Sequence, residues 1–341
     1  MTMKKFFFTL AACLAVISSC KKQENITPTV DKGEKAVLNV SISGGPQAKA
    51  ASFDENKVNS LQVFVFNGNE LDAYGSAAAM TLTLNATTGQ RTVYALVNAP
   101  DLSGIVKLDA LKASVSNLSD NAPDSFVMVG STTQSLGQES NIVVEVNRLA
   151  ARIKLKKLTR NFRSDGLAAL DAASFELVRI YATDVVTANN YALNAVAPYV
   201  WKNSTLSDSS IDTSDEFLLR TPSSPATLAQ GASYSEEMCV FVYPNPCTED
   251  SETAHCTRLV VECRIDGNYY TYPILVPKVE FNKSYEINEL ILTRLGNQSD
   301  GDDSIDTPEN DRIESFEIPF GITVKGWETV LLGNEEGVVT I

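Results

Sequence analysis

Four cysteines and the only histidine lie close together and are the residues best suited to chemistry. Cys239, Cys247, Cys256 and Cys263 fall within 25 residues, and His255 precedes the third of them. Thiols so placed can form disulfides or hold a zinc ion. Zinc is disfavoured because no pair has the two-to-four-residue spacing of a zinc knuckle, although His255 beside Cys256 leaves a zinc site as an alternative. We therefore expect no metal site and no cofactor.

The spacing of these cysteines favours two nested disulfides. Two apolar runs flank a polar loop and would pair as an antiparallel hairpin. In that hairpin Cys239–Cys263 and Cys247–Cys256 share one register to within one residue, which a bulge can absorb. Directly opposed strand residues lie within disulfide distance. The sequence therefore predicts both bridges, as a staple on an exposed hairpin.

Charge and motifs exclude several classes of function. The 341 residues carry 28 Lys and Arg against 42 Asp and Glu, a formal charge of −14. Nucleic acid is not an expected partner, because binding it needs clustered cations. The sequence has no G-x-S-x-G, phosphate-loop or H-E-x-x-H motif. We expect a protein that is not an enzyme, with a pair of catalytic carboxylates as the enzymatic alternative.

The first twenty residues have the layout of an export signal. A basic start precedes about a dozen apolar residues, a run too short to cross a membrane as a helix. The following Ile-Ser-Ser-Cys at 17–20 resembles the lipobox of bacterial lipoproteins. That resemblance implies a signal peptide over residues 1–19 and a lipid such as palmitate on Cys20, while an ordinary signal peptide is the alternative.

The rest of the chain is expected to form short β-strands. Leu38, Val40 and Ile42 alternate with polar residues, which is the period of a half-buried strand, and similar runs recur through the chain. The run at 61–66 is apolar on both faces, as in a buried strand. Because helical periodicity is weak and Gly, Asn and Pro separate the runs, the pattern predicts an all-β fold of sandwiches.

Two boundaries divide this all-β chain. One near residue 149 separates expected domains over 50–149 and 150–296, and residues 297–314 form an acidic segment expected to be a solvated linker. Its acids lack the spacing of a calcium-binding EF-hand. Residues 315–341 then alternate again, with the apolar positions Phe316, Ile318, Phe320, Ile322, Val324 and Trp327. A strand beyond a linker can pair with its own domain or with another subunit.

The order of these segments resembles the fimbrillin family, the major fimbrial subunits of type V pili. The resemblance is carried by the first strand and the apolar strand after it, by the junction near residue 149, and by short segments of the second domain and tail. In this chain they are residues 36–42, 61–68, 89–98, 147–153, 243–245, 257–262, 270–274, 281–287 and 324–327.

Membership of that family would imply both a fold and a pathway of maturation and assembly. The fold is two tandem Greek-key-like β-sandwich domains plus a C-terminal donor strand. The precursor is anchored in the cell outer membrane through Cys20, and a surface trypsin-like protease removes residues 20–49, which hold the tether and the first strand with Leu38, Val40 and Ile42. A neighbouring subunit's C-terminal strand, here Phe316–Trp327, fills the groove by donor-strand exchange. Repetition builds an extracellular pilus (fimbrium) that supports cell adhesion.

The expected cleavage site departs from the family pattern. The family's protease cuts after Arg, whereas the matching bond here is Lys49–Ala50. Either a protease that accepts Lys acts there, or the chain is an unprocessed anchor or accessory fimbrial lipoprotein. A third interpretation is a glycan-binding surface lipoprotein that uses the aromatic runs at 191–201 and 269–272, although core packing explains such runs equally well.

Overall fold

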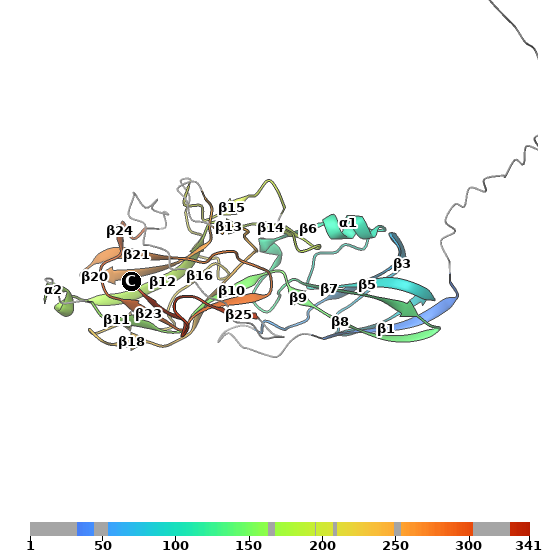
Figure 1. Cartoon of the computed structure of the whole chain (residues 1–341), viewed down its shortest axis with the longest axis horizontal. Coiled ribbons are helices and arrows are strands. Elements are labelled where there is room, and N and C mark those ends of the chain that lie inside the picture. Colours follow the sequence, from blue (N-terminus) through green and yellow to red (C-terminus); the bar gives the residue numbers. More distant parts are fainter. Residues whose placement is uncertain are drawn as a thin grey trace, which may run out of the picture. The chain divides into compact units, whose positions relative to one another are not determined.

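The structure is a computed structural model that describes seven stretches of the chain. They are residues 33–43, 54–162, 168–194, 196–206, 210–248, 254–302 and 328–341. The regular secondary structure of the described residues is almost all strand, so the all-β prediction is confirmed (Figure 1). Two short helices, α1 (Leu108–Ala113) and α2 (Ala168–Ala172), and a 3-10 turn at Leu118–Asp120 complete them. Neither described helix is long and apolar enough to cross a membrane.

An N-terminal strand set, β1–β9, forms two main sheets. One has the order β4-β1-β8, and the other has the order β3-β2-β5-β7-β9. The bounds are β1 Lys35–Ser43, β2 Leu61–Asn67, β3 Glu70–Ala77, β4 Thr81–Thr87, β5 Gly89–Val97, β6 Val115–Asn117, β7 Met128–Leu136, β8 Glu139–Glu145 and β9 Asn147–Arg148. The inward side chains of both sheets belong to one buried cluster. Leu61 to Phe66 on β2 are buried on both faces, as their apolar run predicted.

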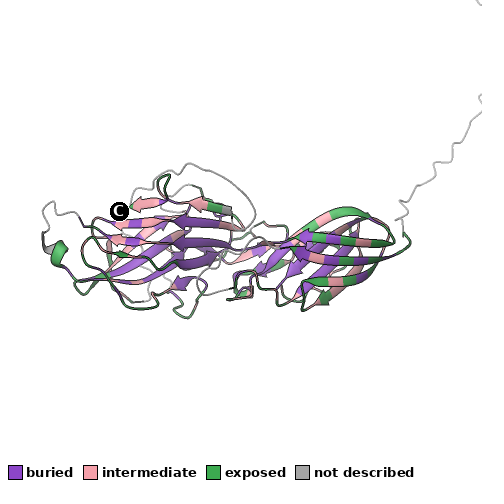
Figure 2. Ribbon diagram, turned by 90° about the horizontal axis from the view of Figure 1, so that it is seen from below, coloured by how far each residue is buried: buried purple, intermediate pink, exposed green. Residues whose placement is uncertain are grey.

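A C-terminal strand set, β10–β26, forms three larger sheets. Their orders are β19-β10-β22-β25, β18-β11-β23-β26 and β16-β12-β20-β21-β24, with β17 also paired to β12. The bounds are β10 Ala151–Leu155, β11 Leu158–Arg160, β12 Phe175–Thr183, β13 Val185–Val186, β14 Ala188–Asn190, β15 Trp201–Lys202, β16 Leu219–Arg220, β17 Ala226–Thr227, β18 Ser233–Tyr234, β19 Met238–Val242, β20 Arg258–Ile265, β21 Asn268–Leu275, β22 Lys283–Ile287, β23 Glu289–Leu292, β24 Asn297–Ser299, β25 Glu328–Leu331 and β26 Val338–Thr340. Figure 2 shows buried residues running along the strands of both sets.

The two strand sets meet near the expected boundary at residue 149. Among the described strands, only the pair β6–β14 joins one set to the other. Side-chain contacts also join the two sets. Phe126 contacts Phe241 with ring centroids 4.8 Å apart, and the Tyr243 hydroxyl accepts a hydrogen bond of 2.8 Å from Asn121 Nδ2. The described residues accordingly belong to one compact unit, and the expected domain limits stay predictions.

The start of the expected acidic linker is docked, so the prediction of a solvated segment from residue 297 is wrong for residues 297–302. Residues Asn297–Ser299 form β24 and pair with β21. The Asp302 carbonyl accepts a hydrogen bond of 2.8 Å from Arg179 Nη2. Pairing to a sheet edge satisfies the hydrogen-bonding groups of the backbone without requiring apolar side chains. The polar composition of residues 297–302 therefore did not indicate that they pair with a sheet. Residues 303–314 lie outside the described ranges.

The last part of the expected donor segment also lies in this chain's own sheets. β25 pairs parallel to β22, and β26 pairs parallel to β23. Leu332 is buried, and the Ile341 carbonyl accepts a hydrogen bond of 2.7 Å from Thr293 Oγ1. Residues 328–341 therefore pair within this chain's own sheets, and the expected donor role of residues 315–341 stays a prediction.

Candidate functional site

The first strand occupies the middle of its sheet. β1 runs antiparallel to β4 on one side and parallel to β8 on the other, and β1 and β8 lie side by side in Figure 1. Leu38, Val40 and Ile42, the expected inward face, are all buried, with Leu38 at 0% exposure. Without β1, two strands would lose their backbone partners and an apolar cluster would face water, which is the condition for strand addition.

A polar ladder on the outer face pins the register of β1. The Asn39 amide donates to Asn141 Oδ1 on β8 at 3.1 Å, and Thr83 Oγ1 on β4 donates to Asn39 Oδ1 at 2.8 Å. A slip by one residue would break both bonds and turn the apolar face outward. Sequence reasoning missed Asn39, because nothing local indicates which strands flank β1.

The cysteine prediction is right for one bridge and wrong for the other. Cys247 and Cys256 form a disulfide with a Cα–Cα distance of 5.1 Å. Cys239 and Cys263 are instead buried free thiols. Their strands do not form a hairpin, because β19 pairs with β10 whereas β20 pairs with β12 and β21 in another sheet. Burial raises the pKa of Cys239 to about 11 and that of Cys263 well above the usual value.

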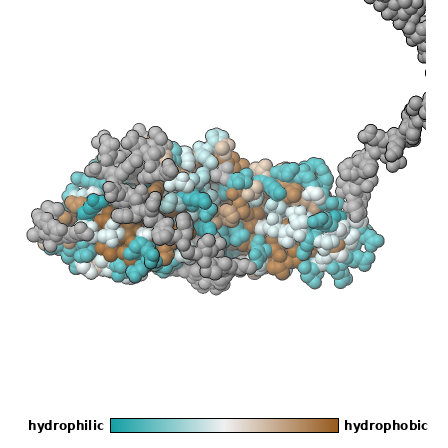
Figure 3. All heavy atoms as spheres, in the orientation of Figure 1, coloured by the Kyte–Doolittle hydropathy of each residue, from teal (hydrophilic) through white to brown (hydrophobic). Residues whose placement is uncertain are grey.

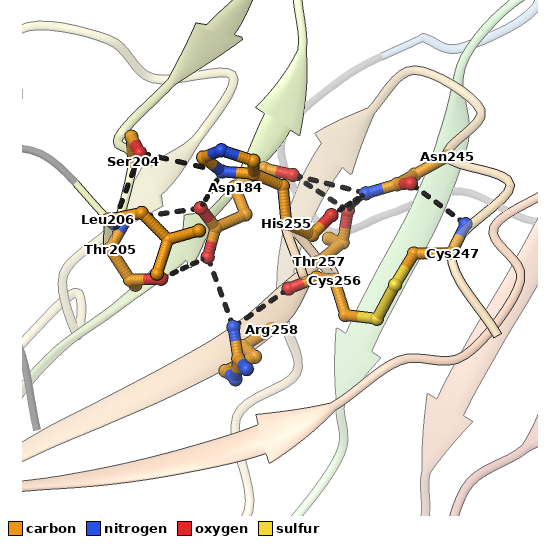
Figure 4. A network of polar contacts seen from close by, with 10 residues as sticks. All are labelled: Asp184, Ser204, Thr205, Leu206, Asn245, Cys247, His255, Cys256, Thr257 and Arg258. Carbon is orange, nitrogen blue, oxygen red and sulfur yellow. Dashed lines mark hydrogen bonds and ion pairs between the residues drawn. A yellow bond between two sulfur atoms is a disulfide. The ribbon is translucent and has the colours of Figure 1, made fainter. Parts of the chain in front are cut away.

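The disulfide closes a loop that is tied to a buried carboxylate, Asp184 (Figure 4). Asp184 is fully buried, and its Oδ2 accepts hydrogen bonds from Arg258 Nη1 at 3.0 Å and Thr205 Oγ1 at 2.6 Å. Asn245 Nδ2 donates to the His255 carbonyl at 2.7 Å. We call Asp184, Thr205, Asn245, His255 and Arg258 the Asp184 network. Sequence reasoning missed Asp184, which is one of 42 acidic residues.

A serine, the histidine and an aspartate meet in this network but do not have the geometry of a proton relay. Asp184 Oδ1 lies 2.9 Å and Ser204 Oγ 3.5 Å from the same ring nitrogen, His255 Nδ1. A nucleophile–His–acid relay needs the acid and the nucleophile on opposite ring nitrogens. The arrangement therefore holds the loop in place and does not activate the Ser204 hydroxyl.

The aromatic runs proposed for glycan binding are divided between core and surface. Tyr191 and Tyr272 are buried, and the Tyr272 hydroxyl donates to the Arg294 carbonyl at 3.0 Å. Trp201 stacks on His255 with centroids 4.5 Å apart and an interplanar angle of 13°, and Tyr199 lies beside it. The core explanation therefore accounts for Tyr191 and Tyr272, whereas one ring face of Trp201 is covered by His255.

The remaining predicted sites lie outside the described residues. They are the lipidation site Cys20, the cleavage site Lys49–Ala50, and the donor positions Phe316, Ile318, Phe320, Ile322, Val324 and Trp327. On the face seen in Figure 3, hydrophobic residues are interspersed with hydrophilic ones. Such scattered apolar residues are normal for a protein surface. Among the described residues, the candidate site is the position of β1 between β4 and β8.

The described residues thus define an all-β protein whose first strand lies in the middle of a sheet, and comparison with known proteins shows what the chain is similar to. Residues 36–156 match the model of the major fimbrial subunit protein (FimA) family. The major fimbrium subunit FimA type-2 of Porphyromonas gingivalis is 30% identical over 101 residues, 29% of this chain and 26% of that protein. The sequence match thus spans about a quarter of that relative. The resemblance to the fimbrillin family is confirmed.

Solved structures of low sequence identity share the fold. A putative cell adhesion protein from Parabacteroides distasonis has a TM-score of 0.57 at 16% identity, over 83% of this chain and 93% of that one. A fimbrilin from Porphyromonas gingivalis has a TM-score of 0.55 at 15% identity, over 79% and 93%. A putative cell adhesion protein from Bacteroides eggerthii has a TM-score of 0.55 at 18% identity, over 87% and 97%.

Proposed function

We propose that this chain is a structural, non-enzymatic subunit of a surface pilus, exported as a lipoprotein and polymerised by donor-strand exchange. The observation that carries the proposal is the position of β1, which fills a groove between β4 and β8 with Leu38, Val40 and Ile42 inward. The match of residues 36–156 to the fimbrial subunit family supports it. In the assembled pilus the subunit contacts other copies of itself or other fimbrial subunits.

Removal of β1 would be the activating step. A trypsin-like protease would cut after Lys49, and the strand would leave with the tether. The groove would then present unpaired backbone and apolar surface to an incoming strand. Donor residues Phe316 to Val324 have the same alternation as β1, and a head-to-tail contact of this kind makes filaments because it does not close.

Trypsin treatment of the purified precursor tests this proposal. Ladders that resist SDS should form, and N-terminal sequencing should find Ala50 first. The change Phe320→Asp should abolish ladders while leaving the unfolding midpoint of the monomer unchanged, and Thr323→Asp, at the outward position of the same segment, is the matched control. Substitution is preferred to truncation because residues 328–341 form β25 and β26 of the monomer.

A second candidate, an unprocessed anchor or accessory subunit, is favoured by the Lys at position 49, where the family's protease cuts after Arg. Two outcomes distinguish these functions. A precursor cut after Lys49 that forms no ladders would contradict the polymerising subunit, and Lys49→Arg that restores processing on intact cells would show that the native protease rejects Lys.

The lipid anchor has its own test. Metabolic labelling with a radioactive fatty acid should mark the precursor at the cell outer membrane, and Cys20→Ser should remove the label. Trypsin-induced ladders of the purified Cys20→Ser chain should be unchanged, because the lipidated segment lies on the discarded side of the cut. A label that persists in Cys20→Ser would contradict the assignment of the anchor.

A further inference from the structure

The segment Asp54–Ser60 begins four residues after Ala50, the proposed new N-terminus, and has no regular secondary structure. Side chains from other parts of the chain nevertheless hold it along its length. It leads into β2. The Glu55 side chain is 1% exposed, and both of its carboxylate oxygens lie 3.1 Å from Arg152 Nη1. Arg152 belongs to β10, so this contact ties the segment to the C-terminal strand set.

A second arginine donates hydrogen bonds to the same segment. Arg148 on β9 donates from Nε to the Glu55 carbonyl at 3.0 Å, and its Nη2 donates to Asn56 Oδ1. Burial lowers the pKa of Arg148 to about 10, so the guanidinium is still charged at neutral pH. Arg148 and Arg152, which we call the arginine clamp, therefore hold Glu55 and Asn56 by charge-assisted hydrogen bonds.

Asn98 holds the other end of the segment. Its Nδ2 donates to the Lys57 carbonyl at 2.8 Å, and its Oδ1 accepts from the backbone nitrogens of Asn59 at 2.8 Å and Ser60 at 3.2 Å. Val58 packs against the core. Lys57 is thus bracketed by fixed residues on both sides, although its own side chain is exposed.

An exposed lysine in this position poses a problem for processing. A protease that accepts Lys49 would also recognise Lys57 by its side chain. Proteases cleave segments that are open or that open locally, and hydrogen-bonded, packed segments are cut slowly. Cleavage after Lys57 would remove Glu55 and Asn56 and release the chain from the arginine clamp.

We propose that the arginine clamp and Asn98 shield the Lys57–Val58 bond and so place the N-terminus of the processed subunit upstream of Asp54. Glu55 and Asn98 are positioning residues that decide which lysine a trypsin-like protease can use. They also keep the new N-terminal end attached to β9 and β10 after β1 has left. This inference rests on the proposed processing, and it concerns a bond that the proposed function does not address.

The reaction that the clamp prevents is simple hydrolysis. One water is consumed, the bond between the Lys57 carbonyl carbon and the Val58 nitrogen breaks, and a carboxylate and an amine remain. No cofactor is needed, so added trypsin is a sufficient probe.

The experiment is a trypsin time course on the full-length precursor, in which mass spectrometry quantifies chains that begin at Val58. Glu55→Gln keeps the side-chain size but removes the charge that faces Arg152. Asn98→Gly removes the bracket without backbone strain, because Asn98 has φ of 55°, which glycine adopts freely. Glu237→Gln is the matched control, since it removes the partner of Lys154 on β10, 2.9 Å away, without touching the segment.

The expected result is a slow cut after Lys57 in the wild type and in Glu237→Gln, and a cut at least about tenfold faster in Glu55→Gln and Asn98→Gly. Adding Lys57→Gln to either variant should abolish chains that begin at Val58. Equal rates in the wild type and both clamp variants, with all chains folded by circular dichroism, would overturn the proposal. Absence of ladders would count only against the proposed function, because this readout requires no polymer.

Discussion

Asp184 and His255 are 71 positions apart in the sequence, yet Asp184 Oδ1 lies 2.9 Å from His255 Nδ1 (Figure 4). The contact joins the turn between β12 and β13 to the loop that the Cys247–Cys256 disulfide closes. Asp184 has φ of 52°, a conformation that Asn and Asp tolerate better than other side chains. The only histidine of the chain thus has a structural partner that fixes a loop.

Asp184→Asn tests the charge of this network without changing the backbone preference. Because Arg258 and His255 would face a neutral amide in a buried place, we expect unfolding to become easier by about 2–3 kcal/mol. Urea denaturation followed by tryptophan fluorescence measures the change. Asp212→Asn is the control. Asp212 is exposed and accepts a hydrogen bond from the backbone nitrogen of Ser214, so this change should cost well under 1 kcal/mol. A loss no larger than that of the control would mean that the network is not stabilising.

The two free thiols should be unreactive in the native protein because both are buried. With the pKa of Cys239 raised to about 11 by burial, this group is a protonated thiol at pH 8, and the thiolate is the reactive form. In a chain without residues 1–20, iodoacetamide should label neither Cys239 nor Cys263 in the native state, and both in urea. Cys247 and Cys256 should react only after reduction. Labelling of all four in urea without a reductant would contradict the bridge.

Leu38→Ala tests whether β1 stabilises the precursor but is absent from the polymer. Leu38 is completely buried, so the precursor should lose about 2–4 kcal/mol of stability, whereas Val37→Ala, at a position 41% exposed, should cost about 0.5 kcal/mol or less. If β1 leaves on processing, polymers made from Leu38→Ala should be as resistant to SDS and heat as wild-type polymers. Weaker polymers would show that β1 stays in the groove.

Leu332→Ala tests whether the C-terminal residues belong to the monomer. Leu332 is 1% exposed next to β25, so shortening its side chain to that of alanine should destabilise the monomer by about 2–4 kcal/mol. Leu206→Ala, at a position 42% exposed, is the control. An unchanged monomer melting temperature together with shortened ladders would instead place this stretch in a neighbouring subunit.

Local patterns in the sequence predicted the strands well and their partners poorly. The alternation at Leu38, Val40 and Ile42 gave the correct inward face, because a period of two is a property of the strand itself. The same reasoning joined the strands of Cys239 and Cys263 into a hairpin, although an intervening loop allowed them to enter different sheets. Sequence neighbours usually pair, but they need not.

The sequence by itself determined the all-β class, the family resemblance and the burial of β1, because strand periodicity and short motifs are local. The tertiary structure alone decided that β1 lies between β4 and β8, that residues 328–341 pair with β22 and β23, and that Glu55 meets Arg152 97 positions away. Sheet pairing and buried ion pairs form between residues far apart in the chain. Their partners are set by which surfaces the folded core brings together, and no local pattern records that choice.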